Sequence, residues 1–435
     1  MTSVAAVSRR GPAGLLLLPA CFLIETILGG PFGIYGGVPV RFLLLFASGL
    51  VLLFALLLRR RIVGAHGIPL LSIVGFMLFN GLWVAIVPVL TGTDMHWALR
   101  EPHAFIVLGL VAVAVALIPP GPLTAAVSRM QRLVVWTALV LAVFQVALWV
   151  LGMVIPALRW AVPVALGAVF RGATDQLYVG EMPDGFFRVF WISTLWCLLA
   201  FFWVPLVIRS TNLRRLCELL LLLDLFVAYS RGIWIGLLAG LLAAAAATIT
   251  LANAGRMLAR FAVGGAAAAL VMVGILAATG ALDRGIARFQ STTSRKDESI
   301  GVRVEQAPSL LALWYEHPFV GSGYGAYSHA NVRSSDAPYS YEHMPYALLA
   351  KLGLLGVVGS GVFFAGWGIT AWGARRRAPA QVAAFLGACV ALLVSEMTNP
   401  MVLNFVSMTI FACLLLQWTM LYGLGLSSPR HHPER

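Results

Sequence analysis

The sequence predicts an all-α polytopic membrane protein with about 12 transmembrane helices and a long periplasmic loop before the tenth. Of its 435 residues, 60% are hydrophobic and 11% are charged, whereas soluble domains carry about 25% charged residues. Apolar runs of about 20 residues, the length of a helix that crosses a bilayer core, recur along the chain. The basic residues gather in alternate loops between these runs. A water-soluble globule is therefore excluded.

Twelve apolar segments are each expected to form one span. Arg9 and Arg10 precede the first segment and imitate a secretory signal. The apolar run continues past Cys21 and many spans follow, so we interpret it as a first helix, not a cleaved signal. All five cysteines lie within apolar runs, which indicates neither a disulfide framework nor a metal cluster. The expected spans are residues 12–30, 38–58, 68–90, 104–119, 132–155, 189–208, 215–230, 232–252, 261–281, 343–372, 380–398 and 402–425.

Positive charge is distributed unevenly over the loops. An even number of spans places both termini on one side, and loops rich in Lys and Arg face the cytoplasm. One set of loops, with both termini, carries 17 of the 30 Lys and Arg and only two acids, Glu218 and Glu434. We therefore expect both termini on the cytoplasmic side of a bacterial inner membrane. We assign the net charge of +13 to contact with anionic lipid, not to nucleic acid. The 17 cations are Arg9, Arg10, Arg59, Arg60, Arg61, Arg129, Arg132, Arg209, Arg214, Arg215, Arg256, Arg260, Arg375, Arg376, Arg377, Arg430 and Arg435.

Polar sequence accumulates on the opposite, outward side in two long segments, residues 156–188 and 282–342. We interpret residues 1–435 as a single integral membrane domain, with 282–342 as a periplasmic loop. A loop of this length exceeds an ordinary connection and indicates a function. Within it, residues 302–315 are expected to form a short helix on the membrane surface, with Leu310, Leu311 and Trp314 on one face.

Ser230-Arg231-Gly232 stands at an outward junction between two spans that have almost no loop between them. A guanidinium group held there suits a phosphate or pyrophosphate ligand, because its planar fork binds phosphate oxygens in pairs. The alternative is an interfacial anchor that reaches to lipid headgroups. Asp224 lies two turns earlier on the expected helical face. We expect it to orient Arg231 indirectly, to pair with a cation on another helix, or to form an interhelical hydrogen bond.

The long loop contains Arg303 and the glycine turn Gly321-Ser322-Gly323-Tyr324-Gly325. This turn is not a dinucleotide-binding fingerprint, because no strand precedes it and it lies on the outward side. Glycine permits positive φ angles and close approach of the backbone. The turn therefore either directs N–H groups toward an anion or folds the loop onto the membrane, and we favour the second.

His343 lies at the start of the tenth expected span, beside Tyr341 and Glu342. A histidine here suits a general base, because the imidazole pKa lies near neutral pH. A structural role is the alternative for His343. It is the simpler interpretation for His317, which merely precedes a proline.

Together these segments resemble the O-antigen ligase/polymerase superfamily of bacterial membrane glycosyltransferases. The resemblance covers about residues 229–356 and rests on four elements in the family's order. These are Ser230-Arg231-Gly232, Arg303, His317-Pro-Phe-Val-Gly-Ser-Gly-Tyr-Gly325, and His343 followed by Gly353-Leu-Leu-Gly356. The chain departs from the family at Met344, where Asn, Ser or Gln is usual, and this leaves the role of base open between His343 and Glu342.

The resemblance implies a metal-independent, inverting transfer of a glycan from undecaprenyl pyrophosphate to an acceptor hydroxyl on the periplasmic side. Arg231 and Arg303 would then stabilise the pyrophosphate leaving group, and His343 would take the acceptor's proton. Arg288 and Arg171 are further candidates for donor contacts, and Tyr341 and Glu342 for substrate binding. The sequence contains no Asp-x-Asp motif, and we expect no metal and no cofactor.

The implied partners are a lipid-linked glycan donor, membrane lipid and one of two acceptors. An O-antigen ligase uses the lipid A core, whereas an O-antigen or exopolysaccharide polymerase uses another lipid-linked glycan. We expect the ligase type, although both would use the same residues. A secondary transporter or lipid flippase is a distant alternative, because the chain shows no paired broken helices in corresponding halves. A purely structural scaffold is the weakest.

Overall fold

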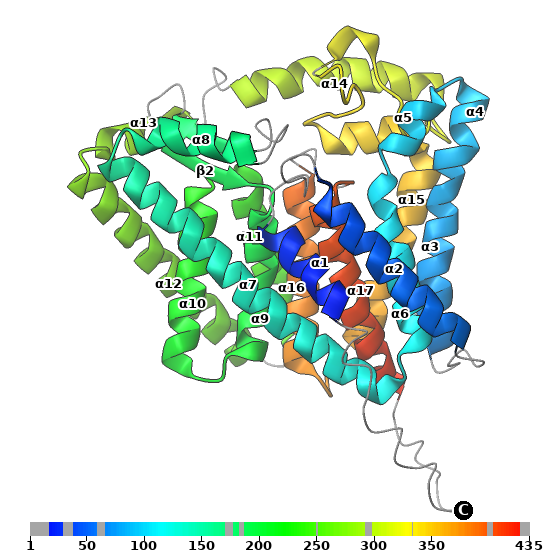
Figure 1. The fold of residues 1–435 in the computed structure, drawn as a ribbon, viewed down its shortest axis with the longest axis horizontal. Helices are drawn as coiled ribbons and strands as arrows, with labels where there is room; N and C mark the ends of the chain where they lie inside the picture. Colours follow the sequence, from blue (N-terminus) through cyan, green and yellow to red (C-terminus); the bar gives the residue numbers. More distant parts are fainter. Residues whose placement is uncertain are drawn as a thin grey trace, which may run out of the picture.

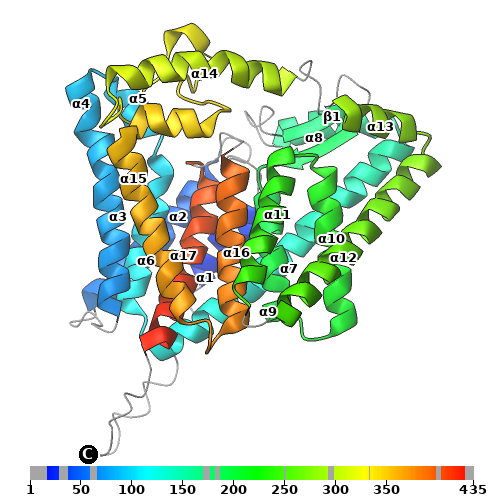
Figure 2. The ribbon, with the colours of Figure 1, turned by 180° about the vertical axis from the view of Figure 1, so that it is seen from behind.

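The computed structural model describes residues 17–28, 38–58, 66–169, 177–181, 187–248, 251–291, 298–332, 334–397 and 403–426. The long helices stand side by side as a bundle, and shorter elements form a layer across its upper end (Figures 1 and 2). The predicted all-α polytopic architecture is confirmed. It positions the outward segments of the sequence together in one layer.

Each of the twelve expected spans contains a helix in the described part of the chain. These helices are α1 (Leu17–Leu28), α2 (Val40–Leu58), α3 (Gly67–Ala85), α6 (Ile106–Leu117), α7 (Pro120–Val154), α9 (Thr194–Val207), α10 (Thr211–Val227), α11 (Arg231–Ala246), α12 (Leu251–Ala278), α15 (Met344–Gly373), α16 (Pro379–Glu396) and α17 (Phe405–Leu426).

Length and composition separate these helices into two groups. Within the described ranges, seven helical segments are long and apolar enough to cross a membrane, and four shorter helices are also apolar. The remaining expected span, α10, carries three charged residues in its first half. A multi-pass membrane protein is therefore confirmed, while twelve crossings stay a prediction. The seven segments are Gly67–Thr91, Met95–Leu117, Gly121–Val154, Gly255–Ala278, Met344–Gly373, Pro379–Glu396 and Phe405–Gly425.

The upper layer contains the outward segments of the sequence (Figure 1). The predicted helix over 302–315 is confirmed and is longer, and Leu310 on it is fully buried. The first turns of α15 lie beneath α14 before the helix turns down into the bundle (Figures 1 and 2). The remaining helices of the described chain are α4 (Val87–Thr91), α5 (Met95–Arg100), η3 (His103–Phe105), α8 (Leu158–Val169), α13 (Leu282–Ser291), α14 (Glu298–Glu316) and η5 (His329–Asn331).

A β-hairpin in the same layer was not predicted from the sequence, which indicated only a long outward segment over 156–188. Strand β1 (Leu177–Glu181) pairs antiparallel with β2 (Phe187–Trp191). β2 packs against α7, where the Trp149 indole donates a 3.0 Å hydrogen bond to the Phe187 carbonyl. Gly152 accepts the Phe187 ring, because a Cβ there would lie 2.2 Å from a ring carbon. Four of the five β2 side chains are buried, so the strand lacks the alternation that identifies a surface strand.

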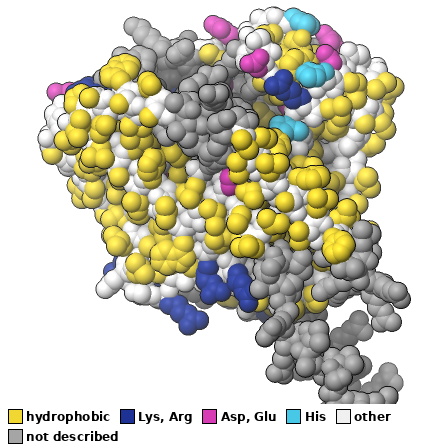
Figure 3. Space-filling view, in the orientation of Figure 1, with side chains coloured by type: hydrophobic (Ala, Val, Ile, Leu, Met, Phe, Trp, Pro, Cys, Tyr) yellow, Lys and Arg dark blue, Asp and Glu magenta, His cyan; other side chains and the backbone are white. Residues whose placement is uncertain are grey.

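Charged side chains lie mainly at the two ends of the face drawn in Figure 3. Figure 3 shows Lys and Arg side chains along the lower end of the molecule, and a mixture of acids, histidines and further Lys or Arg at the upper end. Hydrophobic side chains cover the middle of this face. The basic lower end agrees with lower loops that face anionic lipid, and the orientation in the membrane stays a prediction.

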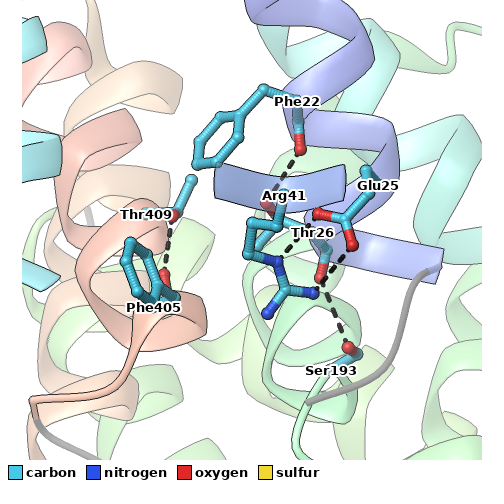
Figure 4. A network of polar contacts seen from close by, with 7 residues as sticks. All are labelled: Phe22, Glu25, Thr26, Arg41, Ser193, Phe405 and Thr409. Atoms are coloured by element: carbon cyan, nitrogen blue, oxygen red, sulfur yellow. Dashed lines mark hydrogen bonds and ion pairs between the residues drawn. The ribbon is translucent and has the colours of Figure 1, made fainter. Parts of the chain in front are cut away.

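A buried ion pair joins the first two helices (Figure 4). Arg41 Nε of α2 lies 2.8 Å from Glu25 Oε2 of α1, and the Arg41 side chain is 0% exposed. Beside them, Ser193 at the start of α9 donates a 3.3 Å hydrogen bond to the Thr26 carbonyl. The pair therefore lies where α1, α2 and α9 meet.

Candidate functional site

Arg303, Glu342 and His343 come together where α14 crosses the start of α15. Arg303 Nε lies 3.6 Å from Glu342 Oε2, and both side chains are partly buried. One turn further along α14, the Gln306 side chain accepts a 3.0 Å hydrogen bond from the Glu342 backbone N–H. One face of α14 thus holds both the side chain and the backbone of Glu342.

His343 precedes the first residue of α15 and is half-buried. Its ring stacks on Tyr346 with 4.2 Å between the ring centres. The Nδ1 atom is buried and forms no hydrogen bond with any other described residue. Burial and, second to it, the positive charge of Arg303 lower the pKa of His343 below its ordinary value. The imidazole is therefore neutral at neutral pH and able to accept a proton.

Tyr341 packs next to the corner, the name used here for the cluster of Arg303, Glu342 and His343. Its side chain is buried against Leu310 of α14 and Ala347 of α15. The hydroxyl oxygen accepts a 2.6 Å hydrogen bond from the Ser328 N–H. Burial raises the pKa of Tyr341 to about 12, so the hydroxyl stays protonated. Tyr341 was predicted to bind substrate, and the contacts that the structure gives it are with other residues of the protein.

The backbone N–H groups of the glycine turn all form hydrogen bonds within the protein. This supports the interpretation that the turn folds the loop. All three of its glycines have positive φ angles, from 69° to 86°. Each of its five N–H groups already donates a hydrogen bond, so none is left for an anion. The acceptors, from 321 to 325, are the carbonyls of His317, Ala350, Lys351 and Trp83, and the carboxylate of Glu101.

Gly353 explains why the sequence has glycine at the start of its second glycine motif, Gly353-Leu-Leu-Gly356. Gly353 interrupts α15 with a φ of 61°. A Cβ there would lie 2.4 Å from both the Gly321 nitrogen and the Phe319 carbonyl oxygen. The following N–H groups, of Leu354 and Leu355, donate to the Pro318 and Phe319 carbonyls. The two motif segments, far apart in the sequence, are therefore in direct contact.

Arg231 begins α11 at the upper end of the bundle, the end that α14 covers (Figure 2). Tyr229, with a φ of 45°, reverses the chain just before it. The Arg188 side chain of β2 holds this reversal with a 2.8 Å hydrogen bond to the Ala228 carbonyl. Arg231 thus stands on a separate helix from the directly joined Arg303, Glu342 and His343, at the same end of the molecule.

The packing of α11 fixes the depth of Arg231. A Cβ at Gly236 would lie 2.0 Å from the Ser395 hydroxyl oxygen of α16, and one at Gly240 would lie 2.4 Å from the Gly387 carbonyl oxygen. Small residues at helix interfaces allow such close approach of backbones in membranes. Only glycine fits at these two positions, so α11 is held tightly against α16.

The expectation that Asp224 shares a helical face with Arg231 is wrong, because α10 ends at Val227 and the chain then reverses. Asp224 is fully buried and lies beside Cys197 of α9. Of the expected interpretations, an interhelical contact is the one that the structure supports.

The remaining candidates from the sequence are Arg171, Arg288 and His317. Arg171 lies outside the described residues. Arg288 belongs to α13 in the upper layer, but its side chain lies outside the described part of the chain. The His317 backbone forms a turn, with its N–H bonded to the Trp314 carbonyl and its own carbonyl to Gly321. This agrees with the structural role expected for His317.

Sequence reasoning did not identify Glu101 and Lys351, which form a buried ion pair behind this corner. A signal was present, because Lys351 is the one Lys or Arg in the expected span 343–372. A charged residue in a span indicates a partner or a function.

Comparison with known proteins finds one family match within the chain. Residues 216–364 match the family described as O-antigen ligase. The match runs from α10 into α15 and includes Arg231, Arg303, His343 and both glycine motifs. No curated protein matches the chain.

The family and the helical bundle together define the general activity. The protein is a multi-pass inner-membrane enzyme of O-antigen or polysaccharide assembly, with lipid-linked glycans as substrates. A ligase or polymerase that transfers glycans is favoured over the transporter that the number of spans also allowed. Residues 216–364 match the O-antigen ligase family, and this match supports the resemblance of the chain to the O-antigen ligase/polymerase superfamily.

Proposed function

We propose that this protein transfers a glycan from undecaprenyl pyrophosphate to a hydroxyl of the lipid A core on the periplasmic side of the membrane. The observation that carries the proposal is the proximity of Arg303, Glu342 and His343 within the residues that match the O-antigen ligase family. It combines a fixed cation with a neutral imidazole. Transfer from a pyrophosphate leaving group to a hydroxyl needs both.

The chemistry follows from these two groups. The neutral His343 removes the proton of the acceptor hydroxyl as its oxygen bonds to the anomeric carbon. The bond from that carbon to the pyrophosphate oxygen breaks, and undecaprenyl pyrophosphate leaves with the electron pair. Arg231 and Arg303 stabilise the negative charge that develops on it. Attack from the face opposite the leaving group inverts the anomeric configuration.

Glu342 is assigned a different role from His343. Its carboxylate pairs with Arg303 at 3.6 Å and its backbone is bonded to Gln306. A carboxylate that neutralises a cation is a weaker base than a neutral imidazole beside it. Glu342 therefore orients the Arg303 guanidinium, and Arg288 and Arg171 supply further donor contacts in this proposal.

Deletion of the gene and lipopolysaccharide gels test the activity. A strain without the ligase loses capped lipopolysaccharide, while finished lipid-linked polymer accumulates. A deletion strain that keeps single repeat units on its core would instead identify a polymerase, and the acceptor would be another lipid-linked glycan.

A further inference from the structure

Glu101 and Lys351 form an ion pair with side chains that are only 7% and 3% exposed. Glu101 follows α5, and Lys351 lies in the first part of α15. Removing two charges from water costs several kcal/mol, which their attraction repays only when the geometry and further hydrogen bonds are good. The surroundings of the pair show where these further bonds go.

Each member of the pair bonds to the loop that leads to His343. The second carboxylate oxygen of Glu101 accepts a 2.6 Å hydrogen bond from the Gly325 N–H. Lys351 Nζ donates a 2.7 Å hydrogen bond to the Tyr339 carbonyl. The ammonium also lies 5.7 Å from the Tyr339 ring centre and 5.6 Å from that of Tyr341. The pair thus anchors both ends of the loop between the glycine turn and α15.

The loop reaches His343 directly after this anchor. Tyr339 is four residues before His343, and Tyr341 packs against the first turns of α15. Glu342 is held from the other side by α14, through Gln306 and Arg303. Lys351 from beneath and α14 from above therefore set the place of the residues 339–343.

We propose that Glu101 and Lys351 are positioning residues that hold the segment 339–343 against α14, so that His343 stays beside Arg303. This inference rests on the proposed role of His343 as the base. Neither residue touches the reacting groups. An ion pair that only stabilises the fold is the alternative, and the two interpretations differ in what they predict for the titration of His343.

The test removes the bond to Tyr339 without leaving a lone buried charge. In Glu101→Gln/Lys351→Met, the side chain at 351 no longer donates a hydrogen bond, while Glu101→Gln/Lys351→Gln keeps an amide donor for Tyr339 and an acceptor for Gly325. The control is Glu25→Gln/Arg41→Met, which removes a second buried ion pair among the described residues. Purified variants are assayed with lipid extract of the deletion strain, which holds donor and acceptor.

We expect the Met variant to lose roughly 10²-fold in kcat, the cost of about 1 Å of misplacement, with an unchanged KM for the donor. The acid limb of its pH profile should move upward toward about 6.5, the ordinary histidine value, because His343 loses burial and the proximity of Arg303. The Gln double variant should stay near the wild-type limb. The control should lower thermal stability without moving the limb.

The proposal is overturned if the Met variant loses only thermal stability and keeps the wild-type pH limb, as the control does. If that variant does not insert, Lys351→Arg keeps the charge and the pairing, but its planar fork cannot occupy the place of the ammonium. It should show the same upward shift, and a wild-type profile there would equally overturn the proposal. Full transfer by His343→Ala would instead remove the proposed base, a result distinct from either.

Discussion

At the residue scale, the electrostatic effect of Arg303 on His343 makes a prediction about pH. The base must be neutral, and burial together with Arg303 lowers the pKa of His343, so transfer should persist below about pH 6.5, the ordinary histidine value. Arg303→Gln removes one of the two causes. The His343 pKa should then rise, and the acid limb of the pH–rate profile should move upward. An unchanged limb would contradict the assigned electrostatic effect of Arg303 on His343.

The two neighbours at the start of α15 are separated by paired substitutions. His343→Ala should slow transfer by roughly 10²–10⁴-fold, the usual contribution of a general base. Binding of undecaprenyl pyrophosphate, measured by thermal shift, should be retained. Glu342→Gln should weaken that binding through Arg303. Retained transfer in His343→Ala with none in Glu342→Gln would assign the base to the carboxylate.

Arg231 is predicted to depend on the shape of its guanidinium as well as its charge. Arg231→Lys keeps the charge but loses the planar fork that binds two phosphate oxygens at once. Transfer by Arg231→Lys should therefore fall nearly as far as transfer by Arg231→Ala, in the same extract assay. A lysine variant with wild-type rates would show that only the charge matters.

At the element scale, the glycine turn is predicted to tolerate no side chain. In Gly325→Ala the new Cβ would lie 2.3 Å from the Ala98 nitrogen at a φ of 80°, and the backbone conformation alone costs about 1–3 kcal/mol. The melting temperature in detergent should fall. Gly361→Ala is the control, because a Cβ at Gly361 meets nothing within 4 Å and its helix benefits from alanine.

The elements were predictable to different degrees. Long apolar runs identified the helices of the bundle, and the spacing of Leu310 and Trp314 identified α14. Strand β2 was not found, because burial of Phe187, Val189 and their neighbours removed the alternating pattern. The reversal before α11 was predicted at Ser230-Arg231-Gly232, whereas the positive φ angle of Tyr229 was not, since that position holds neither glycine nor asparagine.

The site was predictable where local sequence carries chemistry. Arg303, Glu342 and His343 stood out by residue type, and the structure brings them together. The partners that hold them did not stand out, because Gln306 and Lys351 act through contacts between segments far apart in the chain. A sequence shows candidate groups, whereas their supports depend on the packing.

At the scale of the whole molecule, the asymmetry of charge predicts the orientation in the membrane. Reporter fusions after Arg377 should be active in the cytoplasm, and fusions after Asp336 should be active in the periplasm. The lower end of the described surface carries the Lys and Arg side chains that face the cytoplasm under this prediction (Figure 3). A cytoplasmic signal at Asp336 would reverse the orientation and remove the proposed site from the periplasm.

The pairing of Glu101 with Lys351 also sets an order of events during synthesis. The two residues are 250 positions apart, so at ordinary elongation rates about 10–50 s pass between their translation. Throughout this interval Glu101 lacks its partner Lys351, and the loop before α15 lacks the contacts that this lysine makes with it. The loop between the glycine turn and α15 is therefore anchored only after the start of α15 has been made. A nascent chain that contains α5 and α11 but not α15 does not yet have Arg303, Glu342 and His343 in place. Activity appears late in biogenesis, when most of the protein is already inserted.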